Sequence, residues 1–218
     1  MRDYRGNFEV HLTVRTVGPI DQFRNWCVAE QCKCVWIVLD RGAEVQQPMA
    51  TWRRASTILP AVIAQAHQRA EALEQAGFEV VRVKIEADPS NEQVPATDEA
   101  ARLESSSQYF EHHIKLRRNV SAGREMLLQI CLKHAAHLSH NAWRQPVNGV
   151  EERFVTLRSF GLGRSSSEQQ LRRLLAALEA EGEEVIEVES EFAVYDSNLT
   201  LDNGWLLDNA PSFQGTPL

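Results

Sequence analysis

Two related stretches decide the fold: NFEVHLTVRT at residues 7–16 and YFEHHIKLRR at residues 109–118. In both, a Phe-Glu pair is followed by alternating apolar and polar residues, the pattern of a β-strand with one buried face. Further matches follow in the same order along the chain. They are Cys27 with Cys131, MATWRR at 49–54 with FVTLRS at 154–159, and EQAGFEVVRVKIE at 74–86 with EAEGEEVIEVESE at 179–191. The preserved order predicts an internal duplication.

The first unit has the predicted order strand, helix, strand, strand, helix, strand. The corresponding ranges are 8–15, 21–30, 35–39, 49–53, 60–76 and 78–85. This order is typical of a ferredoxin-like βαββαβ unit, which carries its helices on one face of the sheet. We therefore predict an α+β protein in which two tandem ferredoxin-like repeats form an intramolecular pseudo-dimer. The predicted parts are repeats at 1–88 and 108–198, a connector at 89–107, and a tail at 199–218 that packs on the body.

In the second unit, the last helix has clearer signals than the second strand. Ser165 and Glu168 have the spacing of a capping box at the start of this helix, and Gly182 is expected to end it. The second strand, at about 138–143, is much less apolar than its counterpart in the first unit.

Composition limits the partners and the compartment. The 218 residues carry a formal net charge of −7, which argues against a general nucleic-acid binder, because duplex affinity needs clustered Lys and Arg. No apolar run is long enough to span a bilayer, and the first residues have no apolar core of a secretory signal. The four cysteines are a poor disulfide framework. We expect a reduced, cytoplasmic protein without a membrane partner or cofactor; self-association is left open.

Side-chain parity predicts where ionisable groups gather. Because Val10, Leu12 and Val14 must face the helices, the alternate residues of that strand face the open side of the sheet. The same argument applies to the related strand at 109–118 and to the strands at 49–53 and 154–158. The predicted open-face residues are Glu9, His11, Thr13, Arg15, Thr51 and Arg53 in the first unit, and Glu111, His113, Lys115, Arg117, Thr156 and Arg158 in the second. The last strands add Arg82 and Lys84 to one open face and Glu187, Glu189 and Glu191 to the other.

The first of these strands resembles a family motif. His11-Leu12-Thr13-Val14 is similar to the H-x-[ST] motif of the two-histidine phosphoesterases, and His113-Ile114-Lys115-Leu116 departs from it because Lys replaces Ser or Thr. The resemblance implies that His11 and His113 act as general base and general acid on a phosphate in a cleft between two lobes. It also implies that Thr13 holds the phosphate. A duplicated charged tunnel is also similar to the triphosphate-tunnel enzymes, but their E-x-E-x-K opening is absent.

Three other patterns have simpler structural interpretations. His134, His137 and His140 have a spacing that leaves metal binding open, but His134 falls on the apolar face of its predicted helix. Cys32-Lys33-Cys34 lacks a second pair of ligands for a zinc site. Gly161-Leu162-Gly163 before a helix is more simply a turn than a phosphate loop, because the third glycine of a dinucleotide motif is missing. No metal is therefore assigned.

Two functions from different classes remain. In the first, a small phosphorylated or otherwise anionic ligand binds on the open faces, with or without its hydrolysis there. Arg15, Arg53, Lys115, Arg117 and Arg158 would bind the anion, since cationic side chains recognise phosphate, and His11, His113 and Thr13 would take part in the chemistry. In the second, the same faces bind a partner protein or a second copy without catalysis. The sequence does not decide between a phosphoesterase and a non-catalytic scaffold.

Overall fold

The structure is a computed structural model that describes residues 4–15 and 19–205. It confirms the α+β class: eight strands and five α-helices alternate through the described residues. The first half contains β1 (Arg5–Val14), α1 (Ile20–Ala29), β2 (Lys33–Leu39), β3 (Gln46–Ile58), α2 (Leu59–Gln75) and β4 (Val80–Ala87). The second contains β5 (Tyr109–Asn119), α4 (Glu125–Lys133), β6 (Ala136–Asn141), β7 (Val150–Phe160), α5 (Arg164–Ala180) and β8 (Glu184–Asp196). Between them lies α3 (Asp98–Ala101).

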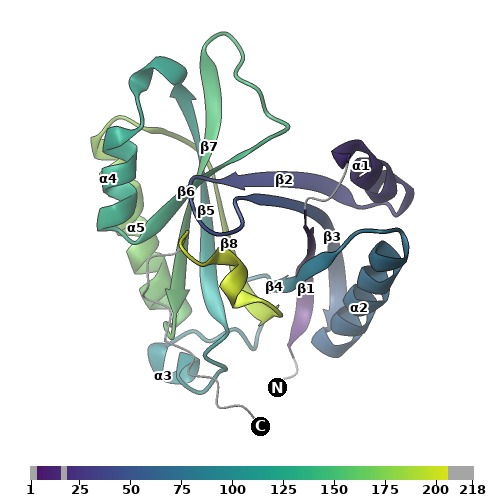
Figure 1. Ribbon diagram of the computed structural model, residues 1–218. Coiled ribbons are helices and arrows are strands. Elements are labelled where there is room, and N and C mark those ends of the chain that lie inside the picture. The colour runs from purple at the N-terminus through teal and green to yellow at the C-terminus, as the bar shows by residue number, and fades with distance from the viewer. Residues whose placement is uncertain (1–3, 16–18, 206–218) are drawn as a thin grey trace.

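The eight strands close into one antiparallel barrel (Figure 1). Its order is β1-β3-β2-β6-β7-β5-β8-β4, so each half contributes four neighbouring strands in the same relative order. The halves join at two seams, where β2 pairs with β6 and β4 pairs with β8. The sequence predicted two sheets with open faces turned toward a shared surface. Because the seams close the sheet, that shared surface is the interior of the barrel.

The apolar side chains of β1 and β5 face outward, under the helices. Val10, Leu12 and Val14 pack with α1 and α2 in one core, and Ile114 and Leu116 pack with α4 and α5 in another. Figure 1 shows the two helix pairs on opposite sides of the barrel. The predicted parity of these strands is therefore observed, and the polar alternate residues of β1 and β5 are directed into the barrel.

The start of α5 corrects one prediction. Ser165 and Glu168 form no capping box; the N-cap is Gly163, without a side-chain cap of its own. Instead, Asp98 from α3 accepts hydrogen bonds from Gly163 N at 2.8 Å and from Ser166 Oγ at 3.0 Å. A Cβ at Gly163 would lie 2.3 Å from the carbonyl carbon of Thr97, so only glycine allows this approach. The hydrogen-bond donors at the start of α5 are therefore bound by the connector and are not left open for a phosphate.

The segment after β8 turns back into one end of the barrel. The 3₁₀ turn η2 (Leu199–Asp202) buries Leu201 and Asp202, and Trp205 is also buried. The indole Nε1 of Trp205 donates to the carbonyl oxygen of Leu138 at 3.2 Å. The first part of the predicted tail therefore packs on the body, and residues 206–218 lie outside the described residues.

No helix in the described part of the chain combines the length and apolar character needed to cross a membrane. All four cysteines are free.

Candidate functional site

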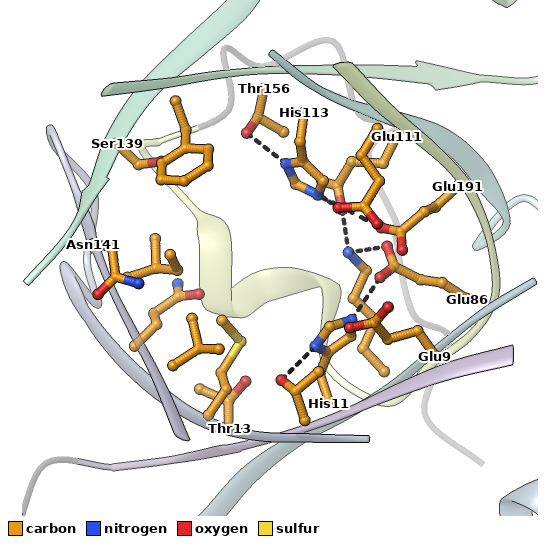
Figure 2. Close-up of a pocket in the computed structure, with 18 of the residues that line it drawn as sticks. Glu9, His11, Thr13, Glu86, Glu111, His113, Ser139, Asn141, Thr156 and Glu191 are labelled. Atoms are coloured by element: carbon orange, nitrogen blue, oxygen red, sulfur yellow. Dashed lines mark hydrogen bonds and ion pairs between the residues drawn. The ribbon is translucent and has the colours of Figure 1, made fainter. Parts of the chain in front are cut away.

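A cavity of about 210 Å³ occupies the barrel interior (Figure 2). Its wall has two chemical characters. The side formed by β2 and its neighbours is largely apolar, with Val35, Ile37, Leu39, Met49 and Phe154. The opposite side carries Glu9, His11, Lys84, Glu86, Glu111, His113, Glu189 and Glu191. This cavity can accept a ligand with an organic part and an ionic part.

His11 is held by contacts at both ring nitrogens. Nδ1 lies 3.0 Å from the hydroxyl of Thr51, its partner in the β1–β3 register, and Nε2 lies 2.7 Å from Glu86 Oε2 on β4. The His11 side chain is 16% exposed and Glu86 only 1%. Two opposed contacts fix the orientation of an imidazole, so His11 is aimed by its strand neighbours.

His113 has the corresponding position in the second half. Its Nδ1 lies 3.1 Å from the hydroxyl of Thr156, the residue beside it in the β5–β7 register. Its Nε2 lies 3.5 Å from Glu111 Oε2 and 3.8 Å from Glu191 Oε2. These separations exceed an ordinary hydrogen bond, so the Nε2 side of His113 is held more loosely than that of His11.

Lys84 connects the two histidine sites. Its ammonium lies 2.5 Å from Glu86 Oε1 and also contacts Glu111 Oε2 (Figure 2). Both carboxylates are 1% exposed and Lys84 is 9% exposed. A continuous chain of polar contacts therefore runs from His11 through Glu86, Lys84 and Glu111 to His113.

This arrangement moves the pKa values of the carboxyl groups apart. Burial opposes ionisation of Glu86, but Lys84 and then His11 outweigh it and hold its pKa well below the usual range. Burial likewise opposes ionisation of Glu111, and Arg158 and Lys84 keep its pKa low. For Glu191, burial and the neighbouring Glu86 carboxylate raise the pKa well above its ordinary value. The cavity wall thus places two carboxyl groups with lowered pKa values, Glu86 and Glu111, near one with a raised pKa, Glu191.

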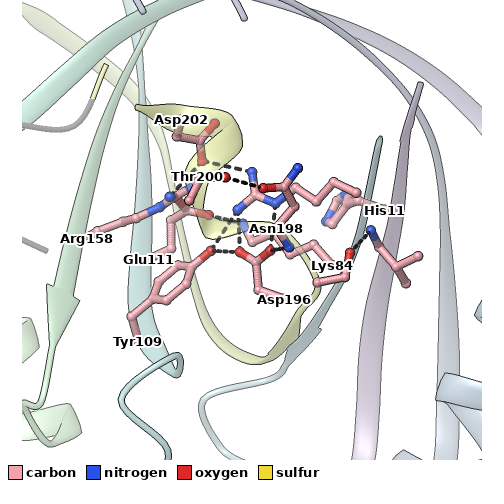
Figure 3. Close-up of polar contacts among 12 residues, drawn as sticks. His11, Lys84, Tyr109, Glu111, Arg158, Asp196, Asn198, Thr200 and Asp202 are labelled. Carbon is pink, nitrogen blue, oxygen red and sulfur yellow. Dashed lines mark hydrogen bonds and ion pairs between the residues drawn. The ribbon is translucent and has the colours of Figure 1, made fainter. Parts of the chain in front are cut away.

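The floor of the barrel is a buried ion-pair network (Figure 3). Asp202 Oδ2 accepts from Arg82 Nη1 at 2.8 Å and lies 2.8 Å from Arg158 Nη1, and Gln47 Nε2 donates to Oδ1 at 2.8 Å. Arg82 also contacts Asp196, and Arg158 contacts Glu111. Because acidic side chains already bind these two guanidinium groups, Arg82 and Arg158 hold the floor together.

The predicted site residues separate into two groups. His11, Thr13, His113 and Arg158 line the cavity. The other four do not line it and form ion pairs elsewhere: Arg15 with Glu79, Arg53 with Glu9 and Glu189, Lys115 with Glu152, and Arg117 with Glu184. Arg53 lines a neighbouring hollow that also contains Glu9 and Glu189. The hydroxyls that contact the imidazoles belong to Thr51 and Thr156, not to Thr13.

The HxxHxxH residues lie apart. His134 caps the end of α4, whereas His137 and His140 lie on β6. His137 is buried against the Trp205 ring, with 5.2 Å between ring centroids. Within the part of the chain that the structure describes, the groups with metal-ligand spacing are Glu86, His113 and Glu191, and Glu9, Glu189 and Glu191. The three histidines form no such group.

His112 gives a prediction about stability against pH. It is buried between the hydroxyls of Ser190 (2.8 Å from Nδ1) and Ser167 (2.7 Å from Nε2), and burial, with His113 nearby, lowers its pKa to about 4. Between pH 6.5 and 4 the unfolded chain binds a proton that the folded chain refuses, so stability falls as the pH falls. Lowering the pH from 7 to 5 is expected to reduce the free energy of unfolding by about 2 kcal/mol through this one residue.

The test compares wild type with His112→Gln by urea unfolding at pH 7 and pH 5. Gln can still bond both serines but does not titrate, so the variant is expected to lose about 2 kcal/mol less than wild type over this interval. Equal losses in the two proteins would contradict a neutral, buried His112.

Sequence reasoning missed two groups that matter at the site. Glu86 lay beyond the predicted end of its strand at Ile85, but β4 runs to Ala87, and extending the alternation of Arg82 and Lys84 by two residues finds it. Asp202 lies in the short turn η2 and has no periodic signal.

A scan against protein-family models finds no match for this chain, and a search of curated proteins finds none either. The function is therefore inferred from the geometry of the barrel.

Proposed function

We propose that the barrel interior binds a small phosphorylated ligand and that His11 and His113 transfer protons during its hydrolysis. The observation that carries the proposal is the matched pair of threonine–histidine–glutamate sets, one from each half, on the wall of one cavity. We further propose that the halves are tandem ferredoxin-like repeats, at 1–88 and 108–198. Duplication would explain why equivalent side chains face each other.

The proton-transfer role follows from what contacts each ring. A threonine hydroxyl at Nδ1 and a carboxylate near Nε2 orient each imidazole, and a positioned imidazole can act as a general acid or base. One neutral histidine would accept a proton from the attacking water while the other, protonated, donates to the leaving oxygen. The phosphorus–oxygen bond to the organic group breaks as the bond to water forms.

Lys33 is the best-placed group to bind the phosphate. In the strand register, Thr51 lies between His11 on β1 and Lys33 on β2, so the three residues form a row across neighbouring strands. Lys33 lines the cavity and, within the described residues, forms no ion pair, unlike Lys84, Arg82 and Arg158. Since its charge is not neutralised by an acid, Lys33 can bind an anion as a point charge.

The apolar side of the cavity limits the ligand further. Val35 and Ile37 come from β2 and Met49 from β3, which lies between β2 and the strand of His11, so an organic group would pack there while the phosphate faces the histidines. This favours an organic phosphate over inorganic phosphate. The alternative of a partner protein on the sheet faces receives less support, because the closed barrel encloses those faces.

The decisive experiment measures hydrolysis of bis(p-nitrophenyl) phosphate by wild type and by the double variant His11→Ala with His113→Ala. We expect the double variant to lose activity by about 100-fold or more, since positioned acid–base groups contribute 10²–10⁴. His67→Ala, an exposed histidine on α2, is the matched control and should keep full activity. Activity that is the same in the double variant would overturn the catalytic role.

Binding is tested separately by thermal shift with p-nitrophenyl phosphate. Ligands that bind the folded state raise the melting temperature, and Lys33→Ala is expected to abolish that rise. A wild-type protein that no phosphate stabilises would refute the binding role.

A further inference from the structure

Three side chains from different strands converge on one point of the cavity wall. Glu86 comes from β4, His113 from β5 and Glu191 from β8, and one donor atom from each lies within 4.8 Å of the others. Figure 2 shows the three side chains close together on one side of the cavity. Their donors are one imidazole nitrogen and two carboxylate oxygens, a set that binds divalent metal ions.

The separations leave room for an ion. His113 Nε2 is 3.8 Å from Glu191 Oε2, too far for a hydrogen bond. Two donors that bind one ion at about 2.1 Å each lie roughly 3–4 Å apart, so this gap has the width that a shared ligand sphere requires. His113 Nδ1 meanwhile contacts Thr156 at 3.1 Å, and a contact at the second nitrogen is what orients a metal-binding histidine.

Of the two carboxylates at this point, Glu86 is paired with Lys84 and His11, whereas Glu191 has no Lys or Arg ion-pair partner among the described residues. Glu191 is 12% exposed, and within the described residues its one ion-pair neighbour is His113. Glu86 Oε1 is buried and forms an ion pair with the Lys84 ammonium at 2.5 Å, but the angles of this contact are not those of a hydrogen bond. A carboxylate oxygen has two lone pairs, so Glu86 can keep Lys84 and bind an ion as well. The adjacent Glu9 and Glu189 already share Arg53.

We propose that Glu86, His113 and Glu191 form a binding site for a divalent cation of the Mn²⁺ type, which accepts both carboxylate and imidazole donors. The remaining coordination positions of the ion are free for water or ligand oxygens. A cation held here takes His113 as a ligand, so the two-histidine proton transfer proposed above applies to the cation-free protein; with the cation bound, a phosphate oxygen would complete the coordination sphere and His11 would remain the proton-transfer group. Only that consequence rests on the proposed function; the cation binds without a phosphate.

The test titrates the full chain with Mn²⁺ in phosphate-free buffer, followed by the loss of the free-ion EPR signal. Mn²⁺ is chosen because thiolates prefer softer metals, so Cys27, Cys32 and Cys34 do not compete. Wild type is expected to bind one ion, and Glu191→Gln to weaken binding by at least tenfold. Glu187→Gln, on the same strand but 63% exposed, is the matched control and should bind like wild type.

Two results would overturn the site. Either wild type fails to bind Mn²⁺, or Glu191→Gln and His113→Asn both bind as tightly as wild type while remaining folded by circular dichroism. Failure of the cation site can be distinguished from failure of phosphate binding. The thermal shift with p-nitrophenyl phosphate is repeated in excess EDTA, which removes any bound divalent cation. Stabilisation by phosphate without any Mn²⁺ binding would leave the ligand proposal standing and refute the cation.

Discussion

Replacement of Lys84 by Met is expected to lower the free energy of unfolding by about 3–5 kcal/mol, the cost of leaving buried charge without its partner. Lys84 contacts two carboxylates, Glu86 and Glu111, and each is 1% exposed. Burial opposes the charge of Lys84, but Glu111 and Glu86 outweigh it and raise its pKa well above the ordinary value. Without the ammonium, Glu86 keeps His11 and Glu111 keeps Arg158, but the two acids repel each other.

The measurement is urea unfolding at pH 7, with Lys115→Met as the matched control. Lys115 lies on β5 and pairs with Glu152 and Glu187, but it is 19% exposed and both acids are more exposed than Glu86. Its replacement should cost less than about 1 kcal/mol. If Lys84→Met and Lys115→Met lower the free energy of unfolding equally, the buried contacts of Lys84 stabilise the fold no more than the more exposed contacts of Lys115.

The effect of Lys84→Met should also depend on pH. Lys84 helps to depress the pKa of both carboxyls, so its stabilising contribution is present above the unfolded pKa near 4.5 and is lost as the pH falls below it. The difference between wild type and Lys84→Met is therefore expected to shrink between pH 5 and pH 3.

Local alternation was enough to predict which side of β1 and β5 packs under the helices. The period of a strand is two, so Val10 and Leu12 under the helices force His11 and Thr13 to the other face, whatever the rest of the chain does. The same rule placed His113 and Arg158 on the cavity side. The α+β class could likewise be predicted, because each helix and strand has its own apolar period.

Depth along the barrel could not be predicted in this way. Parity gives the face of a side chain but not its height, which depends on strand tilt and on the register between strands. Arg15 follows the end of β1 and Arg117 lies near the end of β5, and both are about half exposed and bind acids outside the cavity. Pairing of β2 with β6 and of β4 with β8 is a long-range property that no local pattern encodes.

The second large effect is expected from Asp202→Asn, which should lower the free energy of unfolding by about 3 kcal/mol. The Asp202 carboxylate is 1% exposed and lies between Arg82 and Arg158, which are 4% and 5% exposed. Asn keeps the shape and the oxygen that Gln47 needs, so the substitution removes the charge with little change in packing. Breaking a buried charge pair from one side costs several kcal/mol because the partner remains buried.

The matched control is Asp40→Asn. Asp40 pairs with Arg124 at a similar distance, 2.8 Å, but the two side chains are 23% and 50% exposed. Water screens such a pair, so this substitution should change stability by less than about 1 kcal/mol.

The experiment can also distinguish release of one segment from a loss of stability of the whole barrel. If the segment of residues 197–205 merely covers the end of the barrel, Asp202→Asn would release it, increasing proteolysis near Trp205 while the urea midpoint of the barrel stays at the wild-type value. We expect the midpoint to fall as well, because Asp202 binds cations from both halves: Arg82 on β4 and Arg158 on β7. A carboxylate that joins two halves across the floor of a barrel stabilises the closed barrel itself, since opening either seam would separate the charges that it holds together.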